Sequence, residues 1–372
     1  MIKVLQIGFS SNPGGVENLV MNYYKHINKS QFQFDFLDIY ADGIAYENEI
    51  KTLGGNVLLT PNYKKHPLSF LSQFEKILYS NRYDIVHIHM QSAANILPFL
   101  VVKKYPQSVF IGHCHSSSTP QGFLRKACNS INVHFLRSIN IEKWACGIKA
   151  GNWMWGKYFD QNNIIPNAID YKYYMYNTKI REKIRGKLGI KKEEKVIGFV
   201  GRFGDEKNTF FLLDILKELK KIDCNYRLLT VGGNDLYENF LDRARNENLM
   251  DSIVNVGIKE SARDYYQAMD SFLLPSFFEG FPMVCVEAQA AGLPCFLSDR
   301  ISNEVNITNS VAFLPLGINN ARTWASAIDN TISERTDRNI SFPKNYDINY
   351  AVHILEKSYL NAIKTNEAIS EK

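Results

Sequence analysis

Apolar runs recur along the chain, and stretches with helical spacing separate them. The opening run KVLQIGF and the later runs KVIGFV and YRLLTV do not alternate polar and apolar residues as a strand with one wet face would. Continuous runs of this kind are typical of parallel strands that helices cover on both faces. The rhythm of strand and helix therefore predicts an α/β fold built on parallel sheets.

The chain is long enough for two such sheets. Its 372 residues exceed one ordinary core and suit two domains of roughly 170 to 200 residues each. No apolar run reaches the roughly 18 residues that a membrane span needs, and the first ten residues read as a strand and not as a signal peptide. The six cysteines have no CxxC spacing, so neither a zinc site nor a disulfide framework is indicated. We expect a cytoplasmic protein.

Basic residues are concentrated in the first half. Before Pro166 there are 16 Lys and Arg against 10 Asp and Glu, whereas the remainder carries 27 against 28. A basic first half suits contact with something anionic, such as a membrane surface or a lipid diphosphate. No cluster of basic and aromatic residues matches a nucleic-acid-binding module, so we expect no nucleic acid partner.

The stretch from Ser276 to Gly292 combines a loop with a helix that is nearly all apolar. Pro282 suits a first helical turn, and Gly292 suits the C-terminal stop. Glu287 is the exception in the helix, because an ionised carboxylate there needs hydrogen-bond donors. Hydroxyl groups of a ligand would supply them, and a salt bridge to a distant arginine is the alternative. Glu279 lies eight residues earlier, beside backbone N–H groups that favour an anion.

Two basic residues follow the first strand of the second half. Arg202 comes directly after the apolar run, and Lys207 lies five residues later, near the expected start of a helix. A guanidinium and an ammonium at this spacing can converge on one diphosphate. The alternative is a pair of solvated surface charges.

A glycine pair follows the first strand. Gly14 and Gly15 separate that strand from a stretch with helical spacing. A glycine loop in this place lets the backbone approach a phosphate closely, although a plain tight turn would use the same residues.

Histidines mark the ends of two further strands. His87 and His89 alternate on one strand and fit a structural role as well as a ligand site. His113 and His115 lie two apart and point to the same side of the next. This pair can bond a sugar hydroxyl or a phosphate, whereas a metal site would need a third ligand, for which we find no local candidate. A buried structural pair is the alternative.

Together these motifs resemble the retaining GT-B glycosyltransferases of the large family 4 group, which includes many capsule and exopolysaccharide transferases. The resemblance covers essentially the whole chain. It implies two Rossmann-like parallel-sheet domains that face each other across a cleft. Its elements E-x7-E, G-R-x4-K and GG-x-E fall, in this order, on Glu279 and Glu287, on Arg202 and Lys207, and on Gly14, Gly15 and Glu17.

The resemblance implies a role for each candidate residue. Glu279 would contact the donor sugar and Glu287 the ribose, while backbone groups near Gly257 would hold the base. His115 would face the sugar and phosphate of the donor, with His113 as the alternative. The expected catalytic residues are Glu279, His115, Arg202 and Lys207. The expected donor-binding residues are Gly14, Gly15, Arg202, Lys207, Gly257, Ile258, Glu279, Gly280, Phe281, Pro282, Met283 and Glu287.

The resemblance also implies the domain organisation. We expect an N-terminal acceptor-binding domain over 1–167 and a C-terminal donor-binding domain over 168–349. The tail after Pro343 reads as a pair of helices, and the last one, about 350–372, would pack back on the first domain. The stretch 121–140 reads as a basic amphipathic element. It is either an ordinary surface helix or a contact with the inner face of the cell membrane, where lipid-linked acceptors lie.

The expected function is retaining glycosyl transfer. A sugar would move from a nucleoside diphosphate sugar, most often a UDP-sugar in this family, to a hydroxyl of a glycan or lipid-linked saccharide during surface polysaccharide synthesis. No Asp-x-Asp pair is present, so we expect no metal and no cofactor, with Arg202 and Lys207 neutralising the leaving diphosphate instead. We expect the acceptor hydroxyl to attack on the face from which the diphosphate leaves.

Other activities fit parts of the sequence. A GT-B sugar-nucleotide epimerase shares the fold and the pocket, and it would convert the donor without an acceptor. A nicotinamide-dependent Rossmann oxidoreductase would carry G-x-G-x-x-G after the first strand, where this chain has NPGGVE. A non-catalytic carbohydrate-binding relative would not need the intact set of acids and bases.

Overall fold

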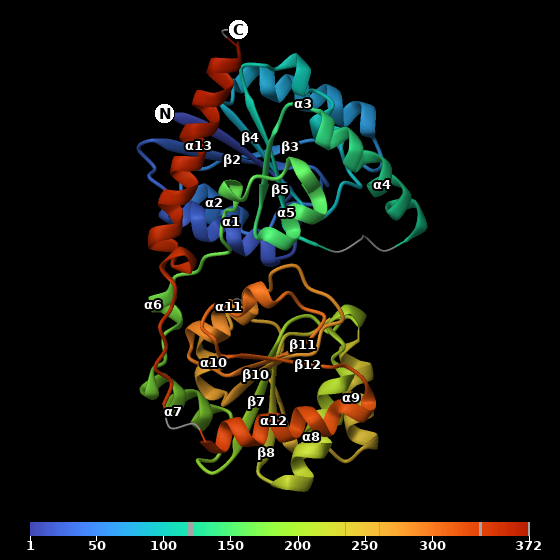
Figure 1. Ribbon diagram of the computed structural model, residues 1–372, viewed down its shortest axis with the longest axis vertical. Helices are drawn as coiled ribbons and strands as arrows, with labels where there is room; N and C mark the ends of the chain where they lie inside the picture. Colours follow the sequence, from blue (N-terminus) through green and yellow to red (C-terminus); the bar gives the residue numbers. More distant parts are fainter. Residues whose placement is uncertain (118–121, 235, 260, 335–336, 371–372) are drawn as a thin grey trace. The chain divides into compact units, whose positions relative to one another are not determined.

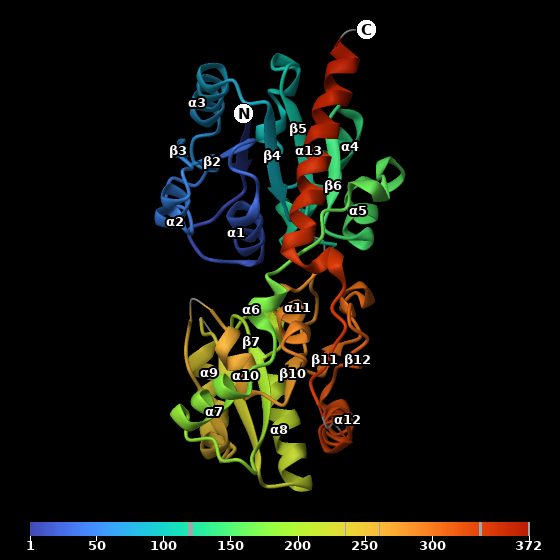
Figure 2. The ribbon, with the colours of Figure 1, turned by 90° about the vertical axis from the view of Figure 1, so that its left-hand side faces the viewer.

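The chain forms two compact units, each built around its own parallel sheet (Figures 1 and 2). The computed structural model describes residues 1–117, 122–234, 236–259, 261–334 and 337–370. The first unit comprises Met1–Ile169 and Lys344–Lys372, and the second comprises Asp170–Pro343. The sequence-based division placed the corresponding boundaries at 167 and at about 350.

The sheet of the first unit has six parallel strands in the order β3-β2-β1-β4-β5-β6. This is the strand order of doubly wound dinucleotide-binding domains. All residues of the central strands β4 and β5 are buried, as expected for strands covered on both faces. The strands are β1 Ile2–Ile7, β2 Phe32–Asp38, β3 Val57–Leu59, β4 Ile85–Met90, β5 Val109–Cys114 and β6 Glu142–Ala145.

Helices from both ends of the chain cover this sheet. The tail forms one continuous helix, α13 (Ile348–Ser370), which contacts α1 and β5 and runs along the first unit in red (Figures 1 and 2). The predicted helix pair is therefore wrong, because no Gly or Pro interrupts residues 348–370. The other helices are α1 Gly15–His26, α2 Glu47–Thr52, α3 Pro67–Asn81, α4 Phe123–Ser138 and α5 Ile148–Trp155.

One aromatic side chain of α13 lies over the middle of the sheet. The ring of Tyr359 is fully buried, and its centroid is 5.8 Å from that of Phe32 on β2 and 5.5 Å from that of Trp144 on β6. The Tyr359 hydroxyl also accepts a hydrogen bond from Nε2 of Gln6 on β1, at 3.3 Å. Gln6 is 1 % exposed, so the opening run is interrupted by a buried polar residue and is not continuously apolar.

The sheet of the second unit repeats the same topology. Its order β12-β11-β10-β7-β8-β9 becomes the same doubly wound order when the strands are numbered from β7. The strands are β7 Lys195–Val200, β8 Tyr226–Val231, β9 Ile253–Asn255, β10 Ser271–Leu274, β11 Cys295–Ser298 and β12 Val311–Leu314. The helices are α6 Tyr171–Tyr174, α7 Thr178–Lys187, α8 Phe210–Ile222, α9 Tyr237–Asn246, α10 Arg263–Ala268, α11 Met283–Ala290 and α12 Ala321–Glu334.

A close backbone approach fixes the loop after β7. Gly232, at the end of β8, has φ of +137°, and a Cβ atom there would lie 1.9 Å from the carbonyl oxygen of Gly201. Only glycine both adopts this left-handed φ readily and avoids a clash between a Cβ atom and the Gly201 carbonyl oxygen. Because of this contact, the end of β8 supports the start of the loop that carries Arg202 and Lys207.

Candidate functional site

Two loops of the second unit meet where the strand order of the sheet reverses. The loop 202–208 follows β7 and the loop 275–279 follows β10, and these two strands are neighbours in the sheet. The loops are bonded to each other, because the backbone N–H of Phe277 donates to the carbonyl oxygen of Glu206 at 2.8 Å. In doubly wound sheets, ligands bind at the carboxyl ends of the two strands where the order reverses.

Lys207 and Glu279 form an ion pair across these two loops. Nζ of Lys207 lies 2.6 Å from Oε1 of Glu279, and the side chains are only 17 % and 13 % exposed. The hydroxyl of Ser276 donates to the same carboxylate oxygen at 2.8 Å. The sequence assigned Lys207 and Glu279 to different parts of a donor, and the structure brings them together. Ser276 was not predicted as a member of the site.

Arg202 lies at the start of the same loop and has an exposed side chain. Its side chain is 71 % exposed and forms an ion pair with Oε1 of Glu206 at 3.0 Å. An exposed pair of this kind contributes little to stability. The guanidinium can therefore exchange this carboxylate for another anion at small cost.

Backbone N–H groups at the start of α11 and in the residue after Glu279 are candidate donors to an anion. The N–H groups of Gly280, Met283 and Val284 donate no hydrogen bond to any residue that the structure describes. Pro282 is the residue before the first helical one, with φ of −70° and ψ of 111°, one position earlier than expected. Gly292 follows the helix with φ of +68°, as the C-terminal stop requires. Unpaired N–H groups at a helix start favour an anion.

Glu287 lies on α11 and is held by two tyrosines. Tyr174 donates to its Oε1 at 3.1 Å, and Tyr266 donates to its Oε2 at 2.9 Å. Burial raises the pKa of Glu287 to about 7, although both hydroxyl donors oppose this change. The sequence predicted that hydroxyl groups would satisfy this carboxylate, and protein hydroxyls provide part of that need. Neither tyrosine was predicted, because α6 and α10 are remote in sequence from α11.

Gln289 is a second polar residue that α11 buries. Its Oε1 accepts from the N–H groups of Ile307 and Thr308, both at 3.1 Å, and its Nε2 donates to the carbonyl oxygen of Val305 at 2.8 Å. The prediction that Glu287 is the polar exception in this helix is therefore incomplete. These hydrogen bonds connect α11 to the segment after β11. They therefore limit movement of α11, the helix that carries Glu287.

The loop 256–258 follows β9 and carries the residues expected near the nucleotide base. The N–H of Gly257 donates to Oδ1 of Asn255, and its carbonyl oxygen accepts from the N–H of Gly232, both at 2.9 Å. The backbone of Gly257 is therefore already engaged within the protein. The side chain of Ile258 is 77 % exposed and gives the loop an apolar surface.

In the first unit, Glu17 holds the glycine loop. Its Oε1 accepts from the backbone N–H of Ser10 at 2.9 Å and from the Ser10 hydroxyl at 2.8 Å. A Cβ atom at Gly14 would lie 2.7 Å from the Glu17 carboxylate, whereas one at Gly15 would meet nothing within 4 Å. Gly14 thus lets the loop close on Glu17, and Gly15 leaves its backbone open to a ligand.

Four histidines on β4, on β5 and directly after β5 form one cluster, in which His87, His89 and His113 are buried and His115 is partly exposed. The strands pair in parallel with His89 opposite His113, and the imidazoles of His113 and His115 are 4.1 Å apart between centroids. His87, His89 and His113 place ring nitrogens within 4.8 Å of one another. The prediction that no third metal ligand exists near His113 and His115 is therefore wrong, because strand pairing supplies candidates that are distant in sequence.

The cluster consists of neutral rings. Burial lowers the pKa of His115 to about 3 and holds the pKa values of His87, His89 and His113 well below their ordinary range. Their hydrogen bonds reach Gln6 and Tyr359, two residues that the sequence did not connect with the histidines.

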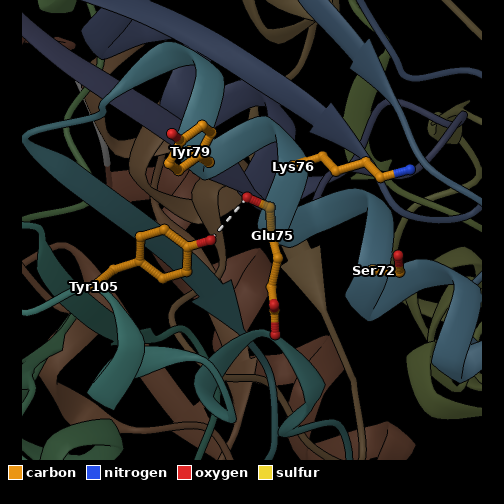
Figure 3. A pocket seen from close by; sticks show the side chains of 5 residues that line it. All are labelled: Ser72, Glu75, Lys76, Tyr79 and Tyr105. Atoms are coloured by element: carbon orange, nitrogen blue, oxygen red, sulfur yellow. Dashed lines mark hydrogen bonds between the residues drawn. The ribbon is translucent and has the colours of Figure 1, made fainter.

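A surface pocket of about 480 Å³ lies elsewhere in the first unit (Figure 3). It is lined by Ser72, Glu75, Lys76, Tyr79 and Tyr105, and the Tyr105 hydroxyl donates to the backbone carbonyl of Glu75 at 2.9 Å (Figure 3). None of the predicted site residues lines it. Its lining includes the acid Glu75 and the base Lys76, but Glu75 is paired with Lys104, and no helix start with unpaired N–H groups belongs to the lining residues.

Solved structures of glycosyltransferases share this fold. The Anabaena protein Alr3699/HepE, in complex with UDP and glucose, matches with a TM-score of 0.70 at 16 % identity, covering 100 % of this chain and 99 % of that one. The predicted fold class, two Rossmann-like domains with parallel sheets, is confirmed.

Sequence comparison defines the family. The profile described as "Glycosyl transferases group 1" matches residues 180–345. The Bacillus subtilis protein EpsF is 32 % identical over 312 residues, covering 82 % of this chain and 81 % of EpsF. The Staphylococcus aureus capsular polysaccharide biosynthesis glycosyltransferase CapH is 27 % identical over 372 residues, covering 97 % and 99 %. The chain belongs to the group 1 glycosyltransferases, and the resemblance inferred from its motifs is confirmed.

A third relative has a fully stated reaction. The Escherichia coli UDP-Gal:α-D-GlcNAc-diphosphoundecaprenol α-1,3-galactosyltransferase is 23 % identical over 352 residues, covering 88 % of this chain and 87 % of that enzyme. The protein is thus an enzyme of the glycosyltransferase class. Neither the epimerase nor the nicotinamide-dependent oxidoreductase is favoured as its function.

Proposed function

We propose that the protein transfers a sugar from a UDP-sugar to a hydroxyl of a glycan or lipid-linked saccharide in surface polysaccharide synthesis. The observation that carries this proposal is the ion pair of Lys207 and Glu279 beside the unpaired N–H groups of α11. The names of CapH and of the Escherichia coli galactosyltransferase support the polysaccharide context and the UDP-sugar donor. The second unit would be the donor-binding domain, and the first would bind the acceptor.

Each polar group of the second unit has a place in this proposal. Lys207, Arg202 and the backbone N–H groups of Gly280, Met283 and Val284 bind the diphosphate and stabilise its charge as it leaves. Glu279 is then released from Lys207 to accept hydrogen bonds from the donor sugar. Glu287 accepts from the ribose hydroxyls, Phe281 and Pro282 shape the loop, and Ile258 packs against the base. The reaction needs no metal and no cofactor.

The proposed stereochemical course is retention. The acceptor hydroxyl attacks on the face that the diphosphate leaves, and a phosphate oxygen takes its proton. His115, on the first unit, bonds the donor or acceptor during transfer. The anomeric configuration of the purified product, read by NMR, tests this course, and an inverted linkage would contradict it.

A thermal-shift panel tests the donor site directly. The protein is melted with UDP, GDP, ADP and NAD, and with UDP-sugars, together with the Lys207→Ala and Glu287→Ala variants. We expect UDP at 100 times its dissociation constant to stabilise the wild type by about 2.7 kcal/mol, and both variants to lose this effect. Stabilisation by NAD alone, or by none of these ligands, would contradict the proposal. An unchanged UDP shift in the presence of EDTA would support the metal-free site.

We also propose that the first unit touches an anionic membrane surface through α4. No helix in the described part of the chain is long and apolar enough to cross a membrane. The start of α4 exposes Phe123 by 85 % and Leu124 by 76 %, with Arg125 and Lys126 exposed directly after them. Arg137, counted with this basic group from the sequence, instead donates to carbonyl oxygens of Trp153 and Met154. Exposed aromatic and basic side chains together favour an anionic interface.

Vesicle sedimentation tests this contact. We expect the wild type to pellet with phosphatidylglycerol vesicles more than with phosphatidylcholine vesicles, and a Phe123→Ser, Leu124→Ser double variant to lose at least half of that binding. The matched control is Leu68→Ser on α3, because Leu68 is also highly exposed. Equal loss in the control and the double variant would contradict a specific role of α4.

A further inference from the structure

Two chains of hydrogen bonds start from one buried amide in the first unit. Nε2 of Gln6 lies 3.3 Å from the Tyr359 hydroxyl, and Oε1 of Gln6 lies 2.8 Å from Nε2 of His89. Each chain runs on through two histidines toward the ends of β4 and β5. Gln6 and Tyr359 are both buried, so water does not compete for these groups.

The first chain determines the protonation of His115. The oxygen of an amide only accepts hydrogen bonds, so Nε2 of His89 must carry a hydrogen. A neutral imidazole has one N–H, which leaves Nδ1 of His89 as an acceptor. It lies 2.9 Å from Nε2 of His115, and this nitrogen must therefore be the donor. The remaining nitrogen of His115, Nδ1, keeps a lone pair and has no hydrogen-bond partner among the described residues.

The second chain follows from the same amide. The NH₂ group of Gln6 donates to the Tyr359 oxygen, and the hydroxyl hydrogen of Tyr359 is then directed at Nδ1 of His87, 2.7 Å away. Nε2 of His87 donates to Nδ1 of His113 at 3.1 Å. His113 thus carries its hydrogen on Nε2, an atom that is buried and has no hydrogen-bond partner. The amide of Gln6 fixes the same tautomer, with hydrogen on Nε2, in all four rings.

A metal ion is the competing occupant of this cluster. His87, His89 and His113 lie close enough together for one, but both nitrogens of His89 are already in hydrogen bonds with Gln6 and His115. A metal would have to break one of these bonds and reorient a buried ring. The present geometry satisfies His89 without it.

We propose that Gln6, His89 and Tyr359 are positioning residues that hold His115 in one tautomer and present its Nδ1 lone pair to a substrate hydroxyl. Tyr359 contributes by orienting the Gln6 amide, and His89 transmits that orientation. The presentation of the His115 lone pair to a substrate rests on the proposed function, whereas the tautomer of His115 is a property of the free protein. The neutral state of the rings in their buried setting agrees with a fixed tautomer.

Histidine ¹⁵N NMR of the full-length protein tests the tautomers without substrate. The eight histidines are labelled, and the four of the cluster are assigned with single His→Gln variants. We expect hydrogen on Nε2 in all four rings. Gln6→Leu should leave His115 as a mixture of tautomers, because His89 loses its acceptor. The control Tyr83→Phe removes a buried hydroxyl that bonds Asp35 in the same unit and should change none of the four.

The Gln6→Glu variant distinguishes the hydrogen-bond chain that ends at His115 from the one that ends at His113. A carboxylate oxygen still accepts from His89, so His115 should keep its tautomer. The second carboxylate oxygen would accept from Tyr359 and reverse the other chain, moving the hydrogens of His87 and His113 to Nδ1. A wild-type His115 with hydrogen on Nδ1, an unchanged His115 in Gln6→Leu, or a stoichiometric metal in the purified protein would each overturn the proposed network.

Kinetics then test the link to transfer. We expect Gln6→Leu to lower kcat about tenfold, a fraction of what positioned acid–base groups contribute, and Gln6→Glu to restore most of it. A mixed His115 tautomer with wild-type kcat would overturn the positioning role. That failure is distinguishable from failure of the proposed function, since UDP would still stabilise the protein in the thermal-shift panel.

Discussion

At the scale of single residues, some members of the candidate site could be predicted from sequence motifs, and others are identified only by how the helices pack. Glu279, Glu287, Arg202 and Lys207 were predictable because each lies in a short motif next to a strand or helix end. Their partners Tyr174 and Tyr266 were not, because they reach Glu287 from α6 and α10. Spacing along a chain says little about contacts that depend on how helices pack.

The raised pKa of Glu287 predicts a dependence of stability on pH. The folded-state pKa of about 7 exceeds the ordinary value of 4.5, so the native protein binds the proton more tightly than the unfolded chain. The stabilisation is complete below pH 4.5 and is lost as pH rises through 7, by about 3 kcal/mol at 1.36 kcal/mol per pKa unit. The buried histidines, whose pKa values are lowered, change stability in the opposite sense over the same range. Between pH 5 and pH 8, urea unfolding should therefore show the wild type losing about 3 kcal/mol relative to Glu287→Gln, in which the histidines are unchanged.

The control for this prediction is Glu193→Gln, at an exposed position of the same unit. It should keep the pH profile of the wild type. An identical profile for Glu287→Gln would show that another group causes the pH dependence.

At the scale of elements, the alternation of apolar runs and helices was enough to predict most strands, because strands covered on both faces are apolar throughout. Prediction was less successful where polar residues are buried. Gln6 on β1 and Gln289 on α11 were read as parts of apolar segments, and their roles depend on acceptors and donors from distant segments. The histidine cluster depends on the register of β4 and β5, which no single run of residues specifies.

The contact between the ends of β7 and β8 gives a prediction at this scale. Gly232→Ala should destabilise the second unit by about 3 kcal/mol, because the new methyl group would meet the Gly201 carbonyl in a left-handed backbone conformation. The neighbouring Gly233→Ala is the matched control, since its Cβ would meet only ordinary contacts at 3.5 Å. Urea unfolding measures both variants. Equal stability of the two would contradict the assigned role of Gly232.

At the scale of the whole molecule, the two units have sheets with the same strand order but carry different groups of candidate site residues. The charged residues proposed to bind the diphosphate, Arg202 and Lys207, and the unpaired N–H groups near α11 lie in Asp170–Pro343, whereas the glycine loop and the histidine cluster lie in the other unit. The two parallel-sheet domains were predictable from the chain length together with the alternation of apolar runs and helical stretches. The single helix α13 was missed, although the absence of Gly and Pro from residues 348–370 favours one uninterrupted helix.

Hydrogen exchange measured by mass spectrometry tests this division. UDP should slow exchange severalfold in peptides that contain the loops after β7 and β10 and the first turn of α11. The sheet of the first unit should change less than twofold. Lys207→Ala should abolish the protection at the same UDP concentration. Protection that is largest in peptides from β1 and β4 would contradict the assignment of the donor to the second unit.

The position of Tyr359 at the centre of the first sheet has a consequence for biosynthesis. A ribosome releases the chain from its N-terminus, so the six strands of the first unit emerge long before the helix that covers them. The second unit is a single continuous segment, Asp170–Pro343, and it can complete its core while α13 is still being made. The part of the enzyme translated first therefore cannot complete its core until the last segment, α13, has been made.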